Sequence, residues 1–349
     1  MQNKSINKTI IGWDIGGAHI KYCVISDNSN IIWYDIMDFE FWNEYKDFKN
    51  ILIEINSIYK KKNYHIENYI TMSAEMCDCF NDRNKGVEFI INEIIKSNCT
   101  AYIFTKNGFL KAPMVKKSLL KVIGSFNWYA TALYIASSFP DIIAIDFGST
   151  TCDFIIIKNG KIKNKRTSDI TGLQSRELLY SGCSRTPIYS HINKINYKKN
   201  SYTIIPEQFS SMSDIYIILD KLSVDSIYSK TSNNSDHTKI NAYKRISRSF
   251  GFDFTYKKLD LVKNLSKKIY NNQIKLIENC ILFHQNKYFK NSKKLNIMGI
   301  GLGHRAISYI SSKNHLNYID INNILEANIH NGSDLTKLFS SYVMCRLNK

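Results

Sequence analysis

The sequence predicts an α/β protein built from two related domains. One pattern carries this prediction: a buried, β-prone run ends in an aspartate, a glycine turn follows, and then a second apolar run begins. The pattern occurs at Asp14-Ile15-Gly16-Gly17 and again at Asp146-Phe147-Gly148-Ser149. A single copy is typical of a simple β-hairpin. Two copies, each opening one half of the chain, indicate duplicated anion-binding loops, because glycine turns let backbone amides approach a phosphate.

The first half supports this prediction through the order of its expected elements. After the first loop we expect two strands, a helix, a strand and a helix, and then a further strand and helix. These elements span His19–Ile25, Ile31–Ile36, Phe41–Tyr59, Tyr69–Ala74, Lys85–Ser97, Ala101–Phe104 and Asn127–Phe139. The predicted first domain is therefore 1–139, with the boundary at Pro140-Asp141.

The second half restarts with strands and then departs from the first half. We expect strands at Asp141–Ala144 and Cys152–Lys158, and a partly helical insertion around 170–250 that contains the helical stretch Met212–Leu222. The Ser/Asn-rich segment Ser229–Asp236 is predicted to be a mobile insertion. Helical periodicity over Tyr256–Phe283 and a strand at Leu295–Met298 complete a predicted second domain of 140–349.

A glycine turn, Gly299–His304, follows the last expected strand and opens a helix. A phosphate turn needs this context, but no acidic partner for a ribose is identifiable. Two interpretations stay open: Gly301 and its neighbours form a ligand-facing wall, or they form a close-packing turn.

Composition limits the classes of function. The chain has 349 residues, 44% of them hydrophobic, and a formal net charge of +17. The cations are mostly lysines scattered among Asn and Ile, so we expect no dedicated nucleic-acid role, although a positive field draws anionic substrates. Eight cysteines without a CxxC pair read as reduced core residues of a cytoplasmic protein. No apolar stretch is long enough to predict a membrane span, and the oligomeric state is not predictable.

The two aspartate-glycine patterns resemble the phosphate loops of actin, the sugar kinases and Hsp70. This resemblance implies a two-domain, ribonuclease H-like α/β fold with a central ligand cleft. It also implies that both loops bind one phosphorylated ligand when the two domains close on it. The patterns cover little of the chain, so they imply a fold and a ligand class but no reaction.

A narrower resemblance extends in order from about Ile10 to Arg305. The chain resembles the tetrahydromethanopterin-linked one-carbon transfer pathway proteins, which act in methanofuran biosynthesis. The blocks that carry the resemblance, besides the first loop, are Thr71–Phe80 (TMSAEMCDCF), Asn127–Ala132 (NWYATA), Asp169–Leu173, Arg176–Gly182 and Arg185–Pro187.

The chain departs from this family's pattern at four places. Arg176 stands where the family usually has Gly, and Phe209–Asp214 differs from the usual Phe-Ala-Thr pattern. His304 replaces an acidic residue, and the region of Trp42 lacks the family's Cys-Pro. These departures concern the acceptor pocket more than the phosphate end.

The resemblance implies a transferase that forms a C–O bond. Its substrates would be an aminomethylfuranmethanol diphosphate and the phenol of γ-glutamyltyramine, and diphosphate would be released. A fold that grips polyphosphate and Mg²⁺ can stabilise such a leaving group. The alternatives are an ATP-dependent small-molecule kinase of the same fold and a nucleotide-binding regulator without turnover.

Roles for individual residues follow from their types. Asp14 and Asp146 are expected to bind Mg²⁺, because hard oxygen ligands facing phosphate suit that ion. Lys21 is the expected cation for the diphosphate, Glu75 or Asp78 the expected base for the phenol, and Arg83 the partner of a carboxylate or of diphosphate. The remaining candidates for substrate or phosphate binding are Gly16, Gly17, His19, Gly148, Ser149, Thr150, Thr151, Asn127, Trp128, Arg185 and Gly301.

Trp128 is expected to line the furan site, although core packing explains it equally well. Arg185 and Arg176 are candidates for the carboxylate of the glutamyl tail, because a guanidinium matches a carboxylate bidentately.

Overall fold

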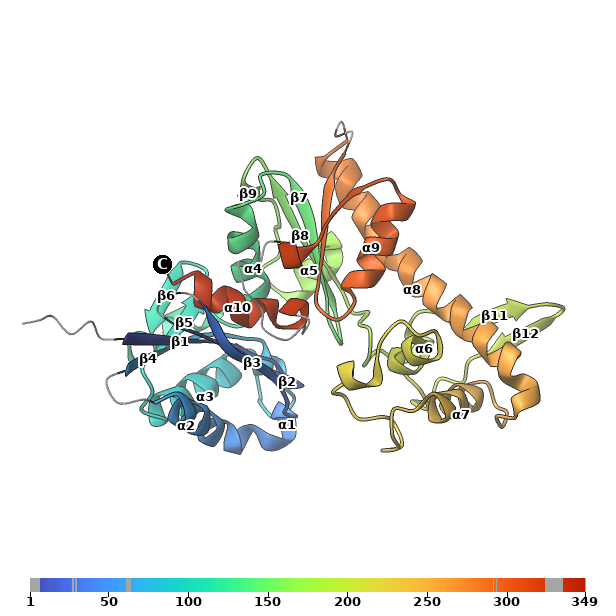
Figure 1. Cartoon of the computed structure of the whole chain (residues 1–349), viewed down its shortest axis with the longest axis horizontal. Coiled ribbons are helices and arrows are strands. Elements are labelled where there is room, and N and C mark those ends of the chain that lie inside the picture. Colours follow the sequence, from blue (N-terminus) through green and yellow to red (C-terminus); the bar gives the residue numbers. More distant parts are fainter. Residues whose placement is uncertain are drawn as a thin grey trace, which may run out of the picture. The chain divides into compact units, whose positions relative to one another are not determined.

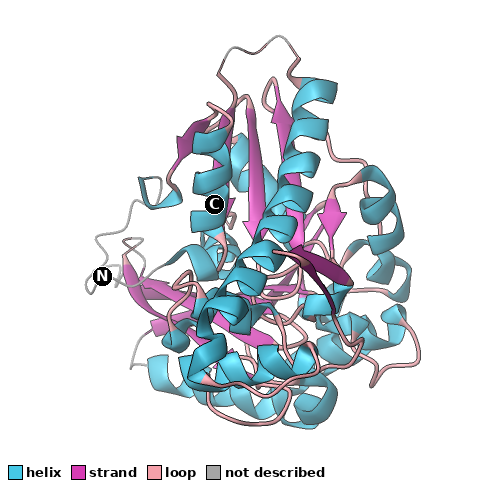
Figure 2. Ribbon diagram, turned by 90° about the vertical axis from the view of Figure 1, so that its right-hand side faces the viewer, coloured by secondary structure: helices cyan, strands magenta, loops and turns pink. Residues whose placement is uncertain are grey.

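A computed structural model describes residues 7–26, 28, 30–60, 64–290, 292, 294–323 and 335–348 of the chain. It contains both helices and strands, as an α/β class requires (Figure 2). Two compact units form, one of Met1–Phe139 with Asn322–Lys349 and one of Pro140–Ile321. The prediction of a second domain that runs to residue 349 is therefore wrong at its C-terminal end. That last segment belongs to the first unit.

Unit 1 contains a six-stranded sheet in the order β3-β2-β1-β4-β5-β6. Strands β1, β4 and β5 are parallel, whereas β2, β3 and β6 are antiparallel to their neighbours. The carboxyl ends of β1 and β4 thus lie at the same edge, where the first glycine loop follows β1. The strands span β1 Asn7–Ile15, β2 His19–Ser26, β3 Ile31–Asp38, β4 Tyr64–Met72, β5 Ala101–Thr105 and β6 Gly108–Lys111.

Helices cover both faces of this sheet (Figure 1). Ile11, Trp13 and Ile15 of β1 point into the core beneath α2 and α3. On the opposite face α10 approaches so closely that an ideal Cβ at Gly12 would lie 2.1 Å from the carbonyl oxygen of Ser341. The helices of unit 1 are α1 Phe41–Glu44, α2 Phe48–Tyr59, α3 Arg83–Lys96, α4 Asn127–Ala136 and α10 Phe339–Arg346, with 3-10 turns η1 Tyr45–Asp47, η2 Ala74–Met76, η3 Ala112–Met114, η4 Lys117–Val122 and η9 Leu335–Leu338.

Unit 2 repeats the central part of this sheet. Its order is β10-β8-β7-β13-β14, with β9 paired to β8. Strand β7 has an antiparallel hairpin partner, β8, on one side and the parallel strands β13 and β14 on the other. The arrangement matches β2, β1, β4 and β5 of unit 1. The strands span β7 Ile142–Phe147, β8 Cys152–Lys158, β9 Lys161–Ile162, β10 Leu178–Leu179, β13 Asn296–Ile300 and β14 Asn317–Ile319.

The insertion of unit 2 contains a hairpin as well as helices. The long helix α8 packs on β7 and β8 and continues to this hairpin (Figure 1). Within the described residues, no helix has the length and hydrophobicity needed to cross a membrane. The elements of the insertion are α5 Asp169–Ser175, β11 Lys194–Tyr197, β12 Asn200–Thr203, α6 Met212–Ile218 and α7 Lys239–Ser249, with 3-10 turns η5 Ile188–Ser190 and η6 Val224–Ser226. The elements that follow it are η7 Tyr256–Lys258, α8 Leu259–Tyr288, α9 His304–Lys313 and η8 Ile321–Asn323, the last of which crosses the boundary between the units.

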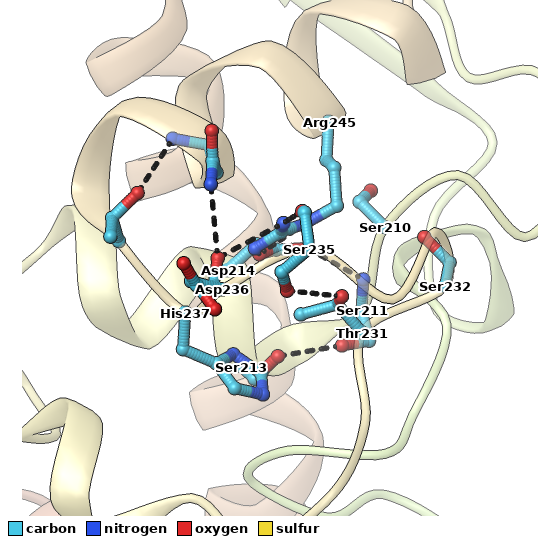
Figure 3. Close-up of polar contacts among 12 residues, drawn as sticks. Ser210, Ser211, Ser213, Asp214, Thr231, Ser232, Ser235, Asp236, His237 and Arg245 are labelled. Atoms are coloured by element: carbon cyan, nitrogen blue, oxygen red, sulfur yellow. Dashed lines mark hydrogen bonds and ion pairs between the residues drawn. The ribbon is translucent and has the colours of Figure 1, made fainter.

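The segment Ser229–Asp236, predicted to be mobile, is tied to the helices around it (Figure 3). The buried guanidinium of Arg245 donates to Asp214 through Nε at 2.9 Å and to the hydroxyl of Ser235 through Nη1 at 2.6 Å. Burial raises the pKa of Asp214, and the pairing with Arg245 opposes that shift. The hydroxyl of Ser232 donates to a backbone carbonyl at 2.6 Å. The buried ion pair therefore anchors a segment whose composition alone suggests mobility.

Candidate functional site

The first glycine turn joins β1 to β2 in a tight hairpin. The amide of Gly16 donates to the carbonyl of His19 at 3.0 Å. The carbonyls of Gly17 and Ala18 accept hydrogen bonds from backbone amides at the entrance to α1, at 2.9 and 3.3 Å. Because the N–H of a trans peptide points opposite to its carbonyl, the amides of Ala18 and His19 point away from these contacts.

The second glycine turn joins β7 to β8 with the same closing hydrogen bond. The amide of Gly148 donates to the carbonyl of Thr151 at 2.9 Å. The carbonyls of Gly148 and Ser149 accept from the three consecutive amides of Cys183–Arg185, at 3.0, 3.2 and 2.9 Å. By the same reasoning, the amides of Ser149 and Thr150 point away from this covering segment.

The structure shows what the first amide of each loop does. The amides of Gly16 and Gly148, which the sequence assigns to phosphate, close the two hairpins. An ideal Cβ at Gly16 would lie 2.8 Å from the carbonyl oxygen of His19, so the hairpin itself requires this glycine. The amides that point away from the loop-fixing contacts come two and three residues after Gly16, and one and two residues after Gly148.

Asp14 is 4% exposed at the end of β1, and its two oxygens have different surroundings. Oδ2 accepts a hydrogen bond from the hydroxyl of Ser340 on α10, and Nζ of Lys21 lies 3.7 Å from it. Oδ1 is buried and has no hydrogen-bond partner among the described residues. In the sheet register, Asp14 is flanked by Lys21 on β2 and Thr71 on β4, so these side chains share one face.

Asp146 takes the corresponding place at the end of β7 but has different neighbours. Gly301, with φ of 77°, approaches so closely that an ideal Cβ would lie 2.7 Å from Oδ1 of Asp146. The residue opposite on β8 is Asp153, which pairs with Arg166 at 2.5 Å and accepts from the hydroxyl of Thr151 at 3.4 Å. Unit 1 places a lysine at this position. The two loops are alike in backbone but not in charge.

The Gly299–His304 turn is explained by close packing. An ideal Cβ at Gly303 would lie 2.1 Å from the ring of Phe147, and its amide donates to the carbonyl of Phe147 at 2.8 Å. Of the three glycines of the turn, Gly301 is the one that approaches the carboxylate of Asp146. The turn is therefore a packing element that borders the second loop.

A buried polar network holds the segment that covers the second loop. An ideal Cβ at Gly182 would lie 2.1 Å from a backbone oxygen of that loop, so only glycine fits there. Nε2 of Gln273 on α8 donates to the hydroxyl of Ser181 at 3.0 Å and to the carbonyl of Gly182 at 2.9 Å. Nε2 of His191 lies 2.8 Å from the same hydroxyl, and burial lowers the pKa of His191.

The two candidate bases have opposite environments. Glu75 is fully buried, accepts from the hydroxyl of Ser125 at 2.6 Å, and lies 3.4 Å from Nε of Arg83. Arg83 also donates to the carbonyl of Gly124. Arg83 was expected to pair with a carboxylate or with diphosphate, and the structure shows it beside the carboxylate of Glu75. Glu75 thus has the surroundings of a structural ion pair.

Asp78 is exposed to solvent. Its neighbour Cys77 lies against the first glycine loop, since an ideal Cβ at Gly17 would be 3.0 Å from the sulfur. The chain therefore brings Asp78 to the edge of this loop with an accessible carboxylate.

The candidates for the organic substrates occupy several elements. Asn127 begins α4 and accepts from the amide of Trp128 at 2.9 Å, and Trp128 is 8% exposed with its ring 5.6 Å from that of Tyr129. The guanidinium of Arg176 lies 4.6 Å from the ring centroid of Phe283. Arg185 is half-buried in the segment that covers the second loop.

A cation site can be assessed from the donors present. In the described part of the chain, no group of three or more His, Cys, Asp or Glu side chains is arranged to hold a metal ion. Mg²⁺, however, binds through one or two carboxylates and keeps several waters. The buried, unsatisfied Oδ1 of Asp14 fits contact with such an ion or with one of its waters.

Residues that sequence reasoning did not single out complete the surroundings of Asp14. Ser340 comes from the opposite end of the chain, and no local pattern links it to the first loop. The sequence analysis names Thr71 only within the family block Thr71–Phe80. It lies in a predicted strand, and a parallel pairing of that strand with the one ending at Asp14 would have placed the two residues together.

Comparisons with known proteins agree with this architecture. A family model described as Hydantoinase/oxoprolinase matches residues 67–329. A solved structure of nucleotide-free acetone carboxylase, 10% identical, aligns over 96% of this chain and 69% of that chain with a TM-score of 0.54, which shows a shared fold. The predicted actin, sugar kinase and Hsp70-like fold is confirmed. The central ligand cleft stays a prediction.

Two curated relatives carry one name, (4-{4-[2-(gamma-L-glutamylamino)ethyl]phenoxymethyl}furan-2-yl)methanamine synthase. That of Methanocaldococcus jannaschii is 29% identical over 344 residues, which cover 97% of each chain. That of Methanococcus vannielii is 32% identical over 183 residues, which cover 51% of this chain and 80% of the relative. The chain therefore belongs to the hydantoinase/oxoprolinase family and, with these two relatives, to the family of the furan-methanamine synthases of methanofuran biosynthesis.

Proposed function

We propose that this protein is a transferase of methanofuran-type cofactor biosynthesis. It joins an aminomethylfuranmethanol diphosphate to the phenol of γ-glutamyltyramine, forms an aryl ether and releases diphosphate. The shared name of the two relatives supports the identity of the product, because it describes a phenol oxygen joined to a furan methylene. The observation that carries the diphosphate part is the pair of glycine loops closed by the same hydrogen bond.

The bond changes define what the protein must supply. The phenol oxygen forms a bond to the furan methylene carbon, and the bond from that carbon to diphosphate breaks, its electron pair leaving with the diphosphate. The phenol proton must go to a base, since the pKa of a phenol is about 10. The site must therefore stabilise negative charge on the leaving group and accept one proton.

Loop amides and Lys21 serve the leaving group. The amides of Ala18, His19, Ser149 and Thr150 point away from the contacts that fix their loops and donate to diphosphate oxygens. Lys21 is 29% exposed at its side chain and supplies a cation beside the first loop. Bound Mg²⁺, with Asp14 and Asp146 as its carboxylates, would neutralise further charge on the diphosphate.

Asp78 is the proposed base, and Glu75 a positioning residue. Asp78 is solvent-exposed beside the first loop, whereas the carboxylate of Glu75 is fully buried and paired with Arg83. A base must come within hydrogen-bond reach of the proton it removes. Arg185 is preferred over Arg176 for the tail carboxylate, because the guanidinium of Arg176 stacks on Phe283.

The test is a product assay on the pure protein. It is incubated with Mg²⁺, the furan diphosphate and γ-glutamyltyramine, and in parallel with Mg-ATP in place of the furan diphosphate. We expect the aryl ether and diphosphate in equal amounts by mass spectrometry and phosphate analysis. ADP formation with a phosphorylated acceptor, and no ether, would assign the protein to the kinases instead.

Asp14→Asn tests the phosphate end. Loss of the carboxylate should lower the rate of ether formation by on the order of 100-fold. Asp47→Asn, a change at an exposed aspartate of η1, is the control and should leave the rate unchanged. Asp78→Asn, which removes the proposed base for the phenol, should lower the rate of ether formation but leave the affinity for diphosphate unchanged. Normal turnover and normal Mg²⁺ dependence in Asp14→Asn would remove Asp14 from the mechanism.

A further inference from the structure

Two buried side-chain oxygen atoms without a hydrogen-bond partner among the described residues belong to neighbouring strands of the unit 1 sheet. Asp14 on β1 and Thr71 on β4 are direct partners in the parallel register, so their side chains point to the same face. Asp14 is 4% exposed and Thr71 is 1% exposed. Neither Oδ1 of Asp14 nor Oγ1 of Thr71 has a hydrogen-bond partner in the part of the chain that the structure describes.

The contacts of Asp14 use only one of its two carboxylate oxygens. The contacts with Ser340 and Lys21 are both made by Oδ2, so they fix the carboxylate without using Oδ1. Thr71 is β-branched, which restricts its hydroxyl to few orientations. Buried polar atoms without partners are rare because their desolvation is not repaid. Two of them together mark a place where a polar ligand completes the structure.

We infer that Thr71 is a ligand-facing residue of the diphosphate site. Its hydroxyl and Oδ1 of Asp14 together hold one water of a hydrated divalent cation, and Ser340 positions the carboxylate. Both groups offer oxygen atoms, which hard divalent cations and their waters prefer, and Mg²⁺ commonly reaches proteins through retained waters. This inference rests on the proposed function, because it assumes that the first loop binds a diphosphate with its cation.

The matched substitutions are Thr71→Val, which removes the hydroxyl and keeps the shape, and Thr71→Ser, which keeps the hydroxyl. Thr9→Val is the control, since Thr9 is a buried threonine near the opposite end of β1. Each variant is titrated with Mg²⁺ alone, diphosphate alone and both together, by calorimetry and by the shift in melting temperature. No turnover is needed for these readouts.

We expect Thr71→Val without ligand to melt at or above the temperature of the unaltered protein, because an unsatisfied hydroxyl is removed. Its affinity for diphosphate in the presence of Mg²⁺ should fall by about 10-fold, as is typical when a residue that contacts a ligand or water of the metal is lost. Thr71→Ser and Thr9→Val should bind as the unaltered protein does.

Unchanged Mg²⁺-dependent binding in Thr71→Val would overturn the inference and leave the proposed function intact. An equal loss of diphosphate affinity with and without Mg²⁺ would also overturn it, because the hydroxyl would then contact phosphate or a resident water. If the unaltered protein binds no Mg²⁺-diphosphate, the inference fails, and the product assay then decides the proposed function separately.

Discussion

At the scale of single residues, Arg176 shows how the chain accommodates a departure from its family. It ends α5 with φ of 59°, in the left-handed region that glycine adopts without strain. The family pattern that the sequence resembles has glycine at this position, and the left-handed backbone gives a physical reason for that preference. The cation–π contact of the guanidinium with Phe283 offsets part of the backbone strain at Arg176.

A pair of substitutions separates these two effects. Arg176→Ala removes the cation–π contact and keeps the backbone strain, whereas Arg176→Gly removes both. Arg176→Gly should therefore be more stable than Arg176→Ala by about 1 kcal/mol, the usual cost of a side chain in this conformation. The free energy of unfolding in urea measures the difference. Equal stabilities of the two variants would show that the residue is not strained.

At the scale of elements, helix α10 connects the C-terminal end of the chain to the first loop. It packs closely on β1 at Gly12, where the absence of a side chain makes room for the helix. Two adjacent serines of the helix, Ser340 and Ser341, have different hydrogen-bond partners. The hydroxyl of Ser340 donates to Asp14, while that of Ser341 donates to the carbonyl of Leu338 at 2.8 Å within its own turn. Only the first of these contacts reaches the candidate site.

Ser340→Ala and Ser341→Ala form a matched pair on this helix. Ser340→Ala should weaken the binding of Mg²⁺-diphosphate by about 10-fold, because Asp14 loses the hydrogen bond that orients it. Ser341→Ala should leave the affinity unchanged and cost about 1 kcal/mol of stability. Calorimetric titration and urea unfolding of both proteins provide the readout. Equal affinities in the two variants would deny Ser340 a positioning role.

The elements also show what sequence reasoning can and cannot reach. Strand-loop-strand patterns located both glycine loops, because alternation and turn residues are local signals. The assignment of α10 to unit 1 was missed, since seven of its eight residues are buried only through tertiary packing and no local pattern says which sheet it covers. Likewise, the composition of Ser229–Asp236 suggests mobility, whereas the buried Arg245 that fixes it comes from the next helix. Such contacts are set by tertiary packing.

At the scale of the whole molecule, the duplicated loops carry the proposed chemistry, and they differ in the charged side chains beside them. Lys21 faces Asp14 in unit 1, whereas Asp153 with its partner Arg166 faces Asp146 in unit 2. The sequence predicted both aspartates and both turns but not this asymmetry, which depends on strand register. The net charge of +17 gives the protein a field that attracts an anionic diphosphate.

Hydrogen exchange of individual backbone amides tests most directly whether both loops bind the diphosphate. The protein is compared alone, with Mg²⁺, and with Mg²⁺ and diphosphate. We predict slower exchange at Ala18 and His19 and, at the same diphosphate concentration, at Ser149 and Thr150. The amides of Gly16 and Gly148 should change little, because they are already hydrogen-bonded within their hairpins. Slower exchange confined to one loop would contradict the account, because the two loops would then not share the leaving group.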